Sequence, residues 1–377
     1  MRDRWDLFCR VVDNYGDIGI AWRLARQLRD HAGLDVRLVV DRLDVFARIE
    51  ARIDPDREVQ VVEGIAVAAW SSIAQRGDEV DVAAVVVEVL GCGLPDAYLE
   101  AMVRCAAQRP PVWIDFEHLS AEPWVTGFHG LPSPHPTLPL IKHFFYPGFG
   151  GGTGGLWIEP GLDKRRCAFL ASPDAVAALW ERLGVPPPEP GESRAALFAY
   201  PDAPLPELLQ ALADDGRWSV LVPGAAAARA VGTARILPVP FVDQDDFDRL
   251  LWICDVDFVR GEDSFVRAQA AGRPFVWQIY GQAEDAHLTK LQAFETLYEA
   301  GLPAAAAQAQ QRMWRAWNDR PDDLPGAARA WLAALPALRA HADAWRERVT
   351  AVSPLVERLV AFVEEREPPV PGGRPVC

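Results

Sequence analysis

The feature that most constrains this chain is an alternation of short apolar runs with segments whose apolar residues recur at helical spacing. Val82–Leu90 is nearly all valine and alanine with a single acid, as expected for a strand covered on both faces. Helical patterns at Ile18–Arg29 and Pro95–Ala107 lie between strand-like runs at Trp5–Val12 and Val112–Asp115. This βαβ rhythm predicts an α/β fold with a parallel, doubly wound sheet.

The rhythm stops at Leu131–Pro160, which is rich in proline and glycine, and a second α/β series begins near Ala195. A chain of 377 residues suits two α/β domains better than one. We expect two Rossmann-like domains facing a central cleft, over residues 1–170 and 171–350. Residues 351–377 would form a helix returning toward the first domain and a loose tail. GT-B glycosyltransferases have this plan, which is equally available to other two-domain α/β enzymes.

Charge and composition exclude several classes of protein. The formal net charge of −15 argues against a non-specific nucleic-acid binder, because such a protein needs a basic surface. We expect neither a signal peptide nor a membrane span, since no run of about 20 uncharged apolar residues occurs. These features favour a cytoplasmic location. We expect the six cysteines to be buried reduced thiols and most of the fourteen tryptophans to be core residues.

Two strings have the letters of a ligand site in an unsuitable place. Gly150–Gly155 satisfies G-x-G-x-x-G, yet a poor helix start follows it, so we interpret it as a flexible loop. Asp255-Val256-Asp257 is a D-x-D that opens an apolar strand, so we interpret it as a helix-to-strand turn. The seven histidines are scattered along the chain, and we expect no metal site.

The strongest N-terminal signal is Val12–Gly19, where the first strand ends and the first helix begins. In open α/β sheets this position faces the ligand crevice. Asp13 and Asp17 supply two carboxylates there, which can act as a general base and an orienting partner, or grip a cation. Gly16 and Gly19 let the backbone approach a ligand closely. Asp17 can equally cap the helix, and the spacing does not decide between these interpretations.

The strongest C-terminal signal is Arg260–Phe265, at the end of a strand and the start of a helix. Backbone N–H groups at a helix N-terminus bind anions, and the Ser264 hydroxyl adds a donor, so a diphosphate fits there. Glu262 could hold a ribose hydroxyl or orient a sugar, and Arg267 could add positive charge one turn further on. The same string also fits a plain helix start with Asp263 or Ser264 as the N-cap.

Upstream, Phe241 and Gln244 offer a flat ring and an amide. A nucleobase can stack on such a ring and pair with such an amide. A phenylalanine taken alone is more often a core residue.

Five strings together resemble one bacterial family, the protein-arginine rhamnosyltransferases of elongation factor P, known as the EarP family. They are Val11–Gly19, Leu119–Trp124, His129–Pro134, Phe144–Phe149 and Asp257–Gln269. The resemblance spans about residues 5–300, and the first and last strings are long and unusual. The chain departs from the family at Asp115-Phe116-Glu117-His118, where an Asn-Leu-Glu-Tyr type is expected.

The resemblance implies a GT-B fold, with acceptor binding in residues 1–170 and nucleotide-sugar binding in 171–350. It implies an inverting, metal-independent transfer of L-rhamnose from dTDP-β-L-rhamnose to one arginine of elongation factor P, without a cofactor. The matching positions would be Asp13, Asp17 and Glu262 as catalytic residues, Asn14, Tyr15 and Gly16 on the acceptor side, and Tyr200, Phe241, Gln244, Asp263 and Ser264 at the donor. Because Asp17 lies nearest the helix start, we expect it to be the base and Asp13 to orient the arginine.

Three other functions stay open on the sequence. A different GT-B nucleotide-sugar enzyme, such as a small-molecule transferase or an epimerase, would need no protein-docking surface. A non-catalytic nucleotide-sugar-binding regulator would not need both Asp13 and Asp17. A Rossmann oxidoreductase is opposed by the misplaced glycine string.

Overall fold

The computed structural model describes residues 4–75, 79–106, 109–225, 227–281, 286–319 and 323–366. The chain divides into two compact units, Met1–Trp157 with Ser353–Cys377, and Ile158–Val352. The division falls earlier than the expected boundary at residue 170, because α6 (Leu162–Leu170) packs within the second unit. There Arg166 Nε donates to the Ala271 carbonyl at 2.8 Å, and the Phe169 ring lies 5.7 Å from that of Trp252. The expected loose tail, Pro368–Cys377, lies outside the described residues.

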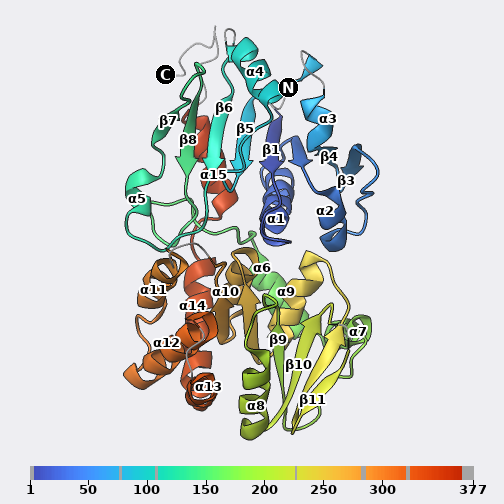
Figure 1. Ribbon diagram of the computed structural model, residues 1–377, viewed down its shortest axis with the longest axis vertical. Helices are drawn as coiled ribbons and strands as arrows, with labels where there is room; N and C mark the ends of the chain where they lie inside the picture. The colour runs from blue at the N-terminus through green and yellow to red at the C-terminus, as the bar shows by residue number, and fades with distance from the viewer. Residues whose placement is uncertain are drawn as a thin grey trace. The chain divides into compact units, whose positions relative to one another are not determined.

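The first unit is built on one sheet, with the strand order β3-β4-β2-β1-β5-β6-β8-β7 (Figure 1). Its inner strands are parallel, and β3 and β7 pair antiparallel at the two edges. The strands are β1 (Trp5–Cys9), β2 (Val36–Val40), β3 (Val59–Val62), β4 (Ile65–Ala69), β5 (Val85–Val89), β6 (Val112–Phe116), β7 (Pro132–Pro134) and β8 (Ile141–Phe145).

Helices cover this sheet because its strands are apolar on both faces. One face packs Phe8 and Trp113 against α3 (Trp70–Ala74) and α4 (Asp96–Ala106) in one buried cluster. The first helix, α1 (Gly16–Asp30), contacts β1, β2, β4 and β5 and also α15 (Leu355–Glu364). The unit is completed by α2 (Leu43–Ile49) and α5 (Val125–Phe128). This is the doubly wound sheet that the sequence predicts.

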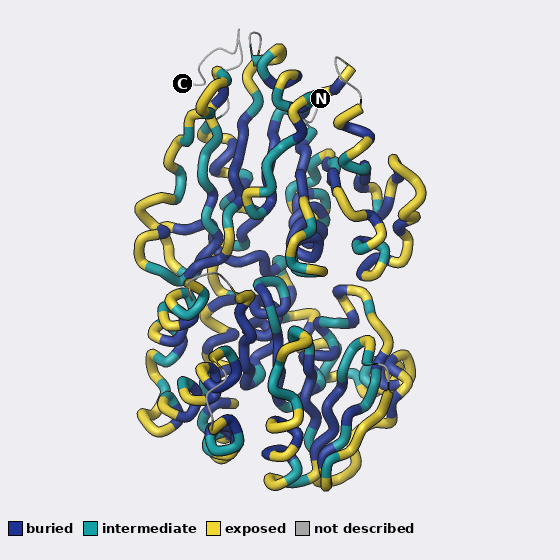
Figure 2. Tube along the Cα trace, in the orientation of Figure 1, coloured by how far each residue is buried: buried dark blue, intermediate teal, exposed yellow. Residues whose placement is uncertain are grey.

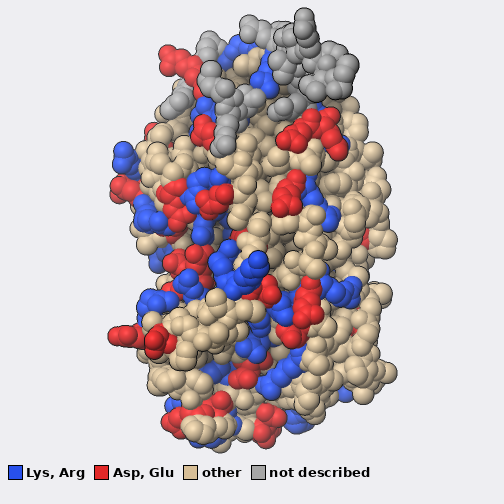
Figure 3. Space-filling view, turned by 180° about the vertical axis from the view of Figure 1, so that it is seen from behind, with Lys and Arg blue, Asp and Glu red and all other residues tan. Residues whose placement is uncertain are grey.

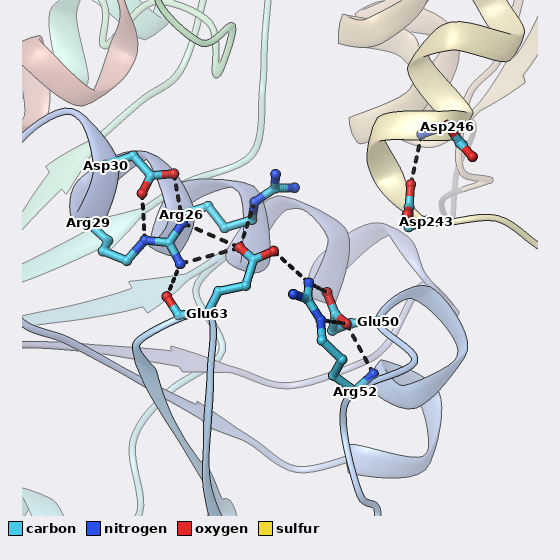
Figure 4. A network of polar contacts seen from close by, with 8 residues as sticks. All are labelled: Arg26, Arg29, Asp30, Glu50, Arg52, Glu63, Asp243 and Asp246. Carbon is cyan, nitrogen blue, oxygen red and sulfur yellow. Dashed lines mark hydrogen bonds and ion pairs between the residues drawn. The ribbon is translucent and has the colours of Figure 1, made fainter. Parts of the chain in front are cut away.

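A network of ion pairs fastens the β3–β4 turn to α1 (Figure 4). Glu63 and Gly64 form a tight turn with φ values of 53° and 77°. The Glu63 carboxylate lies 3.3 Å from both Arg26 and Arg29 and 2.5 Å from Arg52. Because Asp30 and Glu50 pair with these arginines as well, the positive and negative charges match. The network therefore fixes the hairpin.

The second unit has a six-stranded sheet in the order β11-β12-β10-β9-β13-β14, parallel except for β11 at one edge (Figure 1). The strands are β9 (Glu192–Leu197), β10 (Arg217–Pro223), β11 (Arg229–Val231), β12 (Ala234–Val239), β13 (Val256–Arg260) and β14 (Phe275–Gln278). Besides α6, the helices are α7 (Pro173–Leu183), α8 (Leu205–Asp215), α9 (Gln244–Ile253), α10 (Asp263–Ala271), α11 (Ala286–Tyr298), α12 (Ala304–Asp319), α13 (Leu324–Ala333) and α14 (Leu335–Thr350).

Burial follows the sheets, whose strands form the dark core of each unit in Figure 2. Aromatic rings fill much of the second core, where Phe265 stacks on Trp277 at 3.8 Å. All but two of the fourteen tryptophans are buried, Trp70 is half-buried and Trp124 is exposed. No helix within the described ranges is long and apolar enough to cross a membrane.

The expectation for the cysteines is correct only in part. Cys9 and Cys254 are buried and Cys92 is half-buried, whereas Cys105 and Cys167 are exposed. Cys377 lies outside the described residues.

On the face drawn in Figure 3, the coloured Lys and Arg side chains lie among those of Asp and Glu.

Candidate active site

In each unit the strand order changes direction beside the first strand. This switch point lies between β1 and β5 in the first unit and between β9 and β13 in the second. Open α/β sheets bind ligands in the crevice outside the carboxyl ends of the strands at such a point. The segments that join these four strands to the helices after them are residues 10–15, 90–95, 198–204 and 261–262. Both of the strongest sequence signals therefore lie at a switch point.

The loop after β1 is a tight turn that presents Asp13. Asn14 has a φ of 40°, in the left-handed region that asparagine tolerates better than most residues. The Asp13 carbonyl accepts the N–H of Gly16 at 2.7 Å. A Cβ at Gly16 would stand 2.9 Å from Asp13 Oδ2, so glycine lets this carboxylate lie against the first turn of α1. Tyr15, the N-cap residue, is half-buried.

Asp17 reaches back from the first turn of α1 to hold this loop. Its Oδ2 atom accepts the N–H of Val12 at 2.6 Å and of Asp13 at 2.8 Å. Burial raises the pKa of Asp17 and the Asp13 carboxylate adds to the rise, while the two backbone hydrogen bonds and His118 oppose it. Asp17 is therefore not the helix cap. It is a buried carboxyl group that is a stronger base when ionised than an ordinary aspartate.

Neighbouring strands add charged side chains to which the sequence assigns no role. Glu88 on β5 and Asp115 on β6 are register partners in the sheet. Lys142 Nζ lies 2.5 Å from Asp115 and 3.6 Å from Glu88. Burial raises the pKa of Glu117, which follows β6, and Asp115 adds to the rise. Three carboxyl groups thus stand near one ammonium group, a balance that suits a cationic ligand.

The segment after β5 has an unusual backbone. Leu90, Gly91 and Gly93 have φ values of 57°, 61° and 74°, and Gly93 donates its N–H to Glu88 Oε2 at 3.1 Å. A left-handed leucine is uncommon, and such conformations gather at functional sites. A glycine-rich string directly after a valine strand is the signal that could have drawn attention to this segment.

In the second unit, the turn from β13 to α10 is held by Ser264. Its hydroxyl accepts the Arg260 N–H at 3.0 Å and donates to the Arg260 carbonyl. Gly261, with a φ of 59°, makes the turn, and Glu262 occupies the N-cap position. Ser264 is buried, whereas Glu262 and Asp263 are half-buried. The turn therefore places the N-terminus of α10 at the switch point, where its N–H groups can bind an anion.

The expectation for Arg267 is wrong. This side chain is 1% exposed, and its guanidinium pairs with Asp248 at 2.5 Å and with Glu159 at 2.7 Å. Two carboxylates neutralise it inside the second unit. Arg267 therefore stabilises the packing of α10 and offers no charge to a ligand.

The Arg260 side chain, which contacts two aromatic rings, lies beside this turn. The Arg260 guanidinium carbon lies 4.5 Å from the Phe198 ring centre and 4.6 Å from that of Tyr200. Gln278 at the end of β14 accepts the Tyr200 N–H at 2.8 Å and donates to Asp202 at 3.2 Å. The structure thus places Tyr200 next to the Glu262–Ser264 turn. The sequence gives Arg260 a place in the C-terminal string but no role, and it does not point to Gln278, because nothing in it marks their neighbours across strands.

Phe241 and Gln244 follow β12, which lies two strands from β9 in the sheet. Phe241 is 37% exposed, and a Cβ at Gly224 would stand 3.6 Å from its ring. Gln244 is buried at the first position of α9, whose N-cap Asp243 accepts the Asp246 N–H (Figure 4). Phe241 thus exposes part of its side chain next to the first turn of α9.

The glycine string Gly150–Gly155 and the D-x-D string Asp255–Asp257 are parts of the fold. Thr153 Oγ1 donates to the Gly150 carbonyl at 2.8 Å, and Gly154 donates to the Tyr146 carbonyl at 2.7 Å, so the glycine string is a folded loop. Asp255 accepts the Arg194 N–H, and Asp257 is fully buried in β13. Among the residues that the structure describes, no three His, Cys, Asp or Glu side chains are placed to hold a metal.

Comparison with solved structures identifies the class of protein. Spinosyn rhamnosyltransferase SpnG matches with a TM-score of 0.53 at 14% identity, over 97% of this chain and 100% of that one. At this identity the likeness shows the fold alone. Two Rossmann-like units, each with a parallel-rich sheet that has a switch point, give this chain the GT-B fold.

The family follows from closer relatives. A family profile described as "Elongation-Factor P (EF-P) rhamnosyltransferase EarP" matches residues 5–364. A protein-arginine rhamnosyltransferase of Pseudomonas aeruginosa is 45% identical over 95% of this chain and 98% of its own length. A solved structure on EarP-mediated arginine glycosylation of translation elongation factor EF-P has a TM-score of 0.66 at 34% identity, over 96% of this chain and 99% of that chain. The chain belongs to the EarP family.

The chain is therefore a glycosyltransferase of the protein-arginine rhamnosyltransferase kind. This decides against the oxidoreductase and the non-catalytic regulator. It also decides against a transferase or epimerase that acts on small molecules.

Proposed function

We propose that this enzyme transfers L-rhamnose from dTDP-β-L-rhamnose to one arginine of elongation factor P, with inversion at the sugar and without a metal. The arginine glycosylation of EF-P described for the EarP structure supports the choice of acceptor. Since the acceptor is a translation factor, we place the reaction in the cytoplasm. The observation that carries the proposal is the buried Asp17 carboxylate beneath the Asp13 loop, at the switch point of the first unit.

The acceptor dictates the chemistry of the first unit. A guanidinium has a pKa above about 12 and delocalised lone pairs, so it is a poor nucleophile unless it loses a proton as it attacks. Asp13 would hold the cation and Asp17 would take the proton. The raised pKa of Asp17 suits a base better than that of an exposed aspartate. Asn14, Tyr15 and Gly16 shape the turn beside the arginine.

The transfer is one displacement. The guanidinium nitrogen forms a bond to the anomeric carbon, the bond from that carbon to the diphosphate oxygen breaks, and one proton passes to Asp17. The leaving dTDP takes the electron pair of the broken bond. Attack from the face opposite the diphosphate inverts the anomeric centre.

The donor dictates the chemistry of the second unit. N–H groups at the start of α10 would stabilise the negative charge that develops on the diphosphate, and Ser264 would keep them in place. Glu262 and Asp263 would contact the ribose and the sugar. Tyr200, Phe241 and Gln244 would hold the thymine, by stacking on the rings and by the amide. The N–H groups at the start of this helix would do the work that a metal ion does in other transferases.

The direct test incubates the enzyme with dTDP-β-L-rhamnose and elongation factor P and maps the product by mass spectrometry. We expect one deoxyhexose on one arginine, formed equally well in excess EDTA. NMR of the product should show the anomeric configuration opposite to that of the donor. Modification of another residue type, or activity that EDTA abolishes and Mg²⁺ restores, would contradict the proposal.

A further inference from the structure

The first unit exposes one group of large apolar side chains beside its candidate site. Trp124, Phe128 and Leu131 are 45%, 48% and 45% exposed and lie within or next to α5. Figure 2 shows most of this segment in the colour of exposed residues. Trp124 is the one exposed tryptophan of the fourteen, all of which lie in the described ranges. Contiguous apolar surface of this kind often marks a site where another protein binds.

This apolar patch is rigid. The Trp124 ring packs edge-on against Phe128 and against Tyr146, each at 5.5 Å. Beneath it, Val125 is 1% exposed, and the His129 N–H closes the turn on the Val125 carbonyl at 2.9 Å. Little conformational entropy is lost when a surface held in this way binds a partner.

The patch is continuous with the acidic end of the sheet. Tyr146, which touches Trp124, directly follows β8. Glu117 donates its N–H to the Phe145 carbonyl at 3.0 Å, and Asp115 is the register partner of Phe144, so Tyr146 follows a strand that runs beside both acids. Burial raises the pKa of Tyr146, and the charges of Glu117 and Asp115 add to the rise. A surface with aromatic anchors beside carboxylates is complementary to a protein segment that carries both an apolar residue and a basic one.

We infer that Trp124, Phe128 and Leu131 form the docking surface for the acceptor protein, which contacts the patch with apolar residues flanking the arginine that it presents to the acidic edge. This inference rests on the proposed function. An arginine side chain alone gives little to recognise, so contacts outside the reacting group must supply much of the specificity for one protein.

The chain offers a matched control on the same sheet. Val59 and Val61 are 47% and 71% exposed on β3, at the opposite end of the strand order from β8. Like the patch they expose apolar surface, but they lie far from the acidic end of β6 and β8.

The test compares Trp124→Ala and Phe128→Ala with Val61→Ala in three assays. These are the Kd for unmodified elongation factor P without donor, the KM for that protein in the transfer assay, and the Kd for dTDP. We expect each patch variant to weaken elongation factor P binding about 10- to 100-fold, as truncated interface anchors do. The kcat at saturating acceptor and the Kd for dTDP should stay within about twofold of wild type, as they should for Val61→Ala. Thermal unfolding excludes loss of fold, and Phe128→Ala guards against an indirect effect through Tyr146.

Three results would overturn the inference. Patch variants that bind elongation factor P as wild type does would show that the surface is unused. A changed Kd for dTDP with unchanged acceptor binding would mean that the patch serves the second unit. A changed molar mass in light scattering would mean that it serves a second copy of the chain. If wild-type enzyme binds elongation factor P but does not modify it, the proposed function fails, while the binding assay still decides the docking surface.

Discussion

The two switch-point turns use the same device with opposite polarity. In the first unit, Asp17 reaches back from the first turn of a helix and accepts the N–H groups of Val12 and Asp13. In the second, Ser264 reaches back from the first turn of a helix and bonds both backbone polar groups of Arg260. Each side chain fixes the loop that joins the strand to the helix. One loop presents carboxylates, and the other presents backbone N–H groups beside a guanidinium.

This difference sorts the substrates by charge. A carboxylate edge attracts an arginine, and a helix N-terminus next to a cation attracts a diphosphate. Because both groups that hold the loops are buried, each turn is rigid before a substrate arrives. The predictions below test whether the polarity of each turn, rather than its shape alone, assigns its substrate.

The largest effect should come from Asp17→Asn, which keeps the shape of the side chain and removes the base. We expect the transfer rate to fall by about 10²- to 10⁴-fold, the usual contribution of a general base. The wild-type rate should fall as pH drops through the raised pKa of Asp17, because the protonated carboxyl cannot accept a proton. Rate against pH for both proteins checks this, and a wild-type rate in the variant would remove Asp17 from the mechanism.

Gly16→Ala should separate activity from stability in the first turn. The new Cβ would stand 2.9 Å from Asp13 Oδ2 and push the carboxylate away, while alanine itself favours the helix. We expect a rate loss of about 10- to 100-fold with an unchanged or higher unfolding temperature, because misplacing one reacting group has such a cost. Gly150→Ala is the control, since its Cβ would meet nothing within 4 Å. Equal activity in both variants would contradict the assigned place of Asp13.

Gln278→Leu should weaken dTDP binding by the second unit and leave the site in the first unit unchanged. It removes the bonds from Gln278 to the Tyr200 N–H and to Asp202. We expect the Kd for dTDP to rise about tenfold, the equivalent of roughly 1.4 kcal/mol. Gln310→Leu removes similar buried bonds, to Phe275 and Trp331, away from this edge. It should lower the unfolding temperature and leave the Kd for dTDP unchanged. Equal effects on binding would mean that Gln278 acts only through stability.

The smallest effect concerns Asp257, the second residue of β13, at the end of that strand opposite the Glu262–Ser264 turn. It is fully buried, and neither carboxyl oxygen has a hydrogen-bond partner among the described residues. Burial raises its pKa well above the usual value and Asp255 adds to the rise, while Arg273 opposes it. A raised pKa means that this acid favours the folded state at low pH and opposes it as pH rises through that pKa. Asp257→Asn should therefore raise the unfolding temperature by about 2–4 °C at pH 8 and by less at pH 4. A larger gain at pH 4 would contradict this account.

Prediction from sequence succeeded where one segment contains the whole signal. Strands that are apolar on both faces predicted doubly wound sheets. Asp13 in the loop after β1 and Asp17 in the first turn of α1 lie where the pattern of strand and helix places them. It failed where the partner lies far along the chain. Arg267 looked like a phosphate ligand until Glu159 and Asp248 were found to neutralise it. Glu88 and Asp115 likewise meet only through strand register.

The most direct test measures dTDP binding by calorimetry in Asp17→Asn and in Phe241→Ala. Suppose that the turn of the first unit binds the acceptor and the turn of the second unit binds the donor. Asp17→Asn then binds dTDP within about twofold of wild type yet transfers almost no rhamnose. Phe241→Ala should bind dTDP at least about fivefold more weakly, because it loses a stacking ring. Loss of dTDP binding in Asp17→Asn, with wild-type binding in Phe241→Ala, would contradict the division of labour between the two turns.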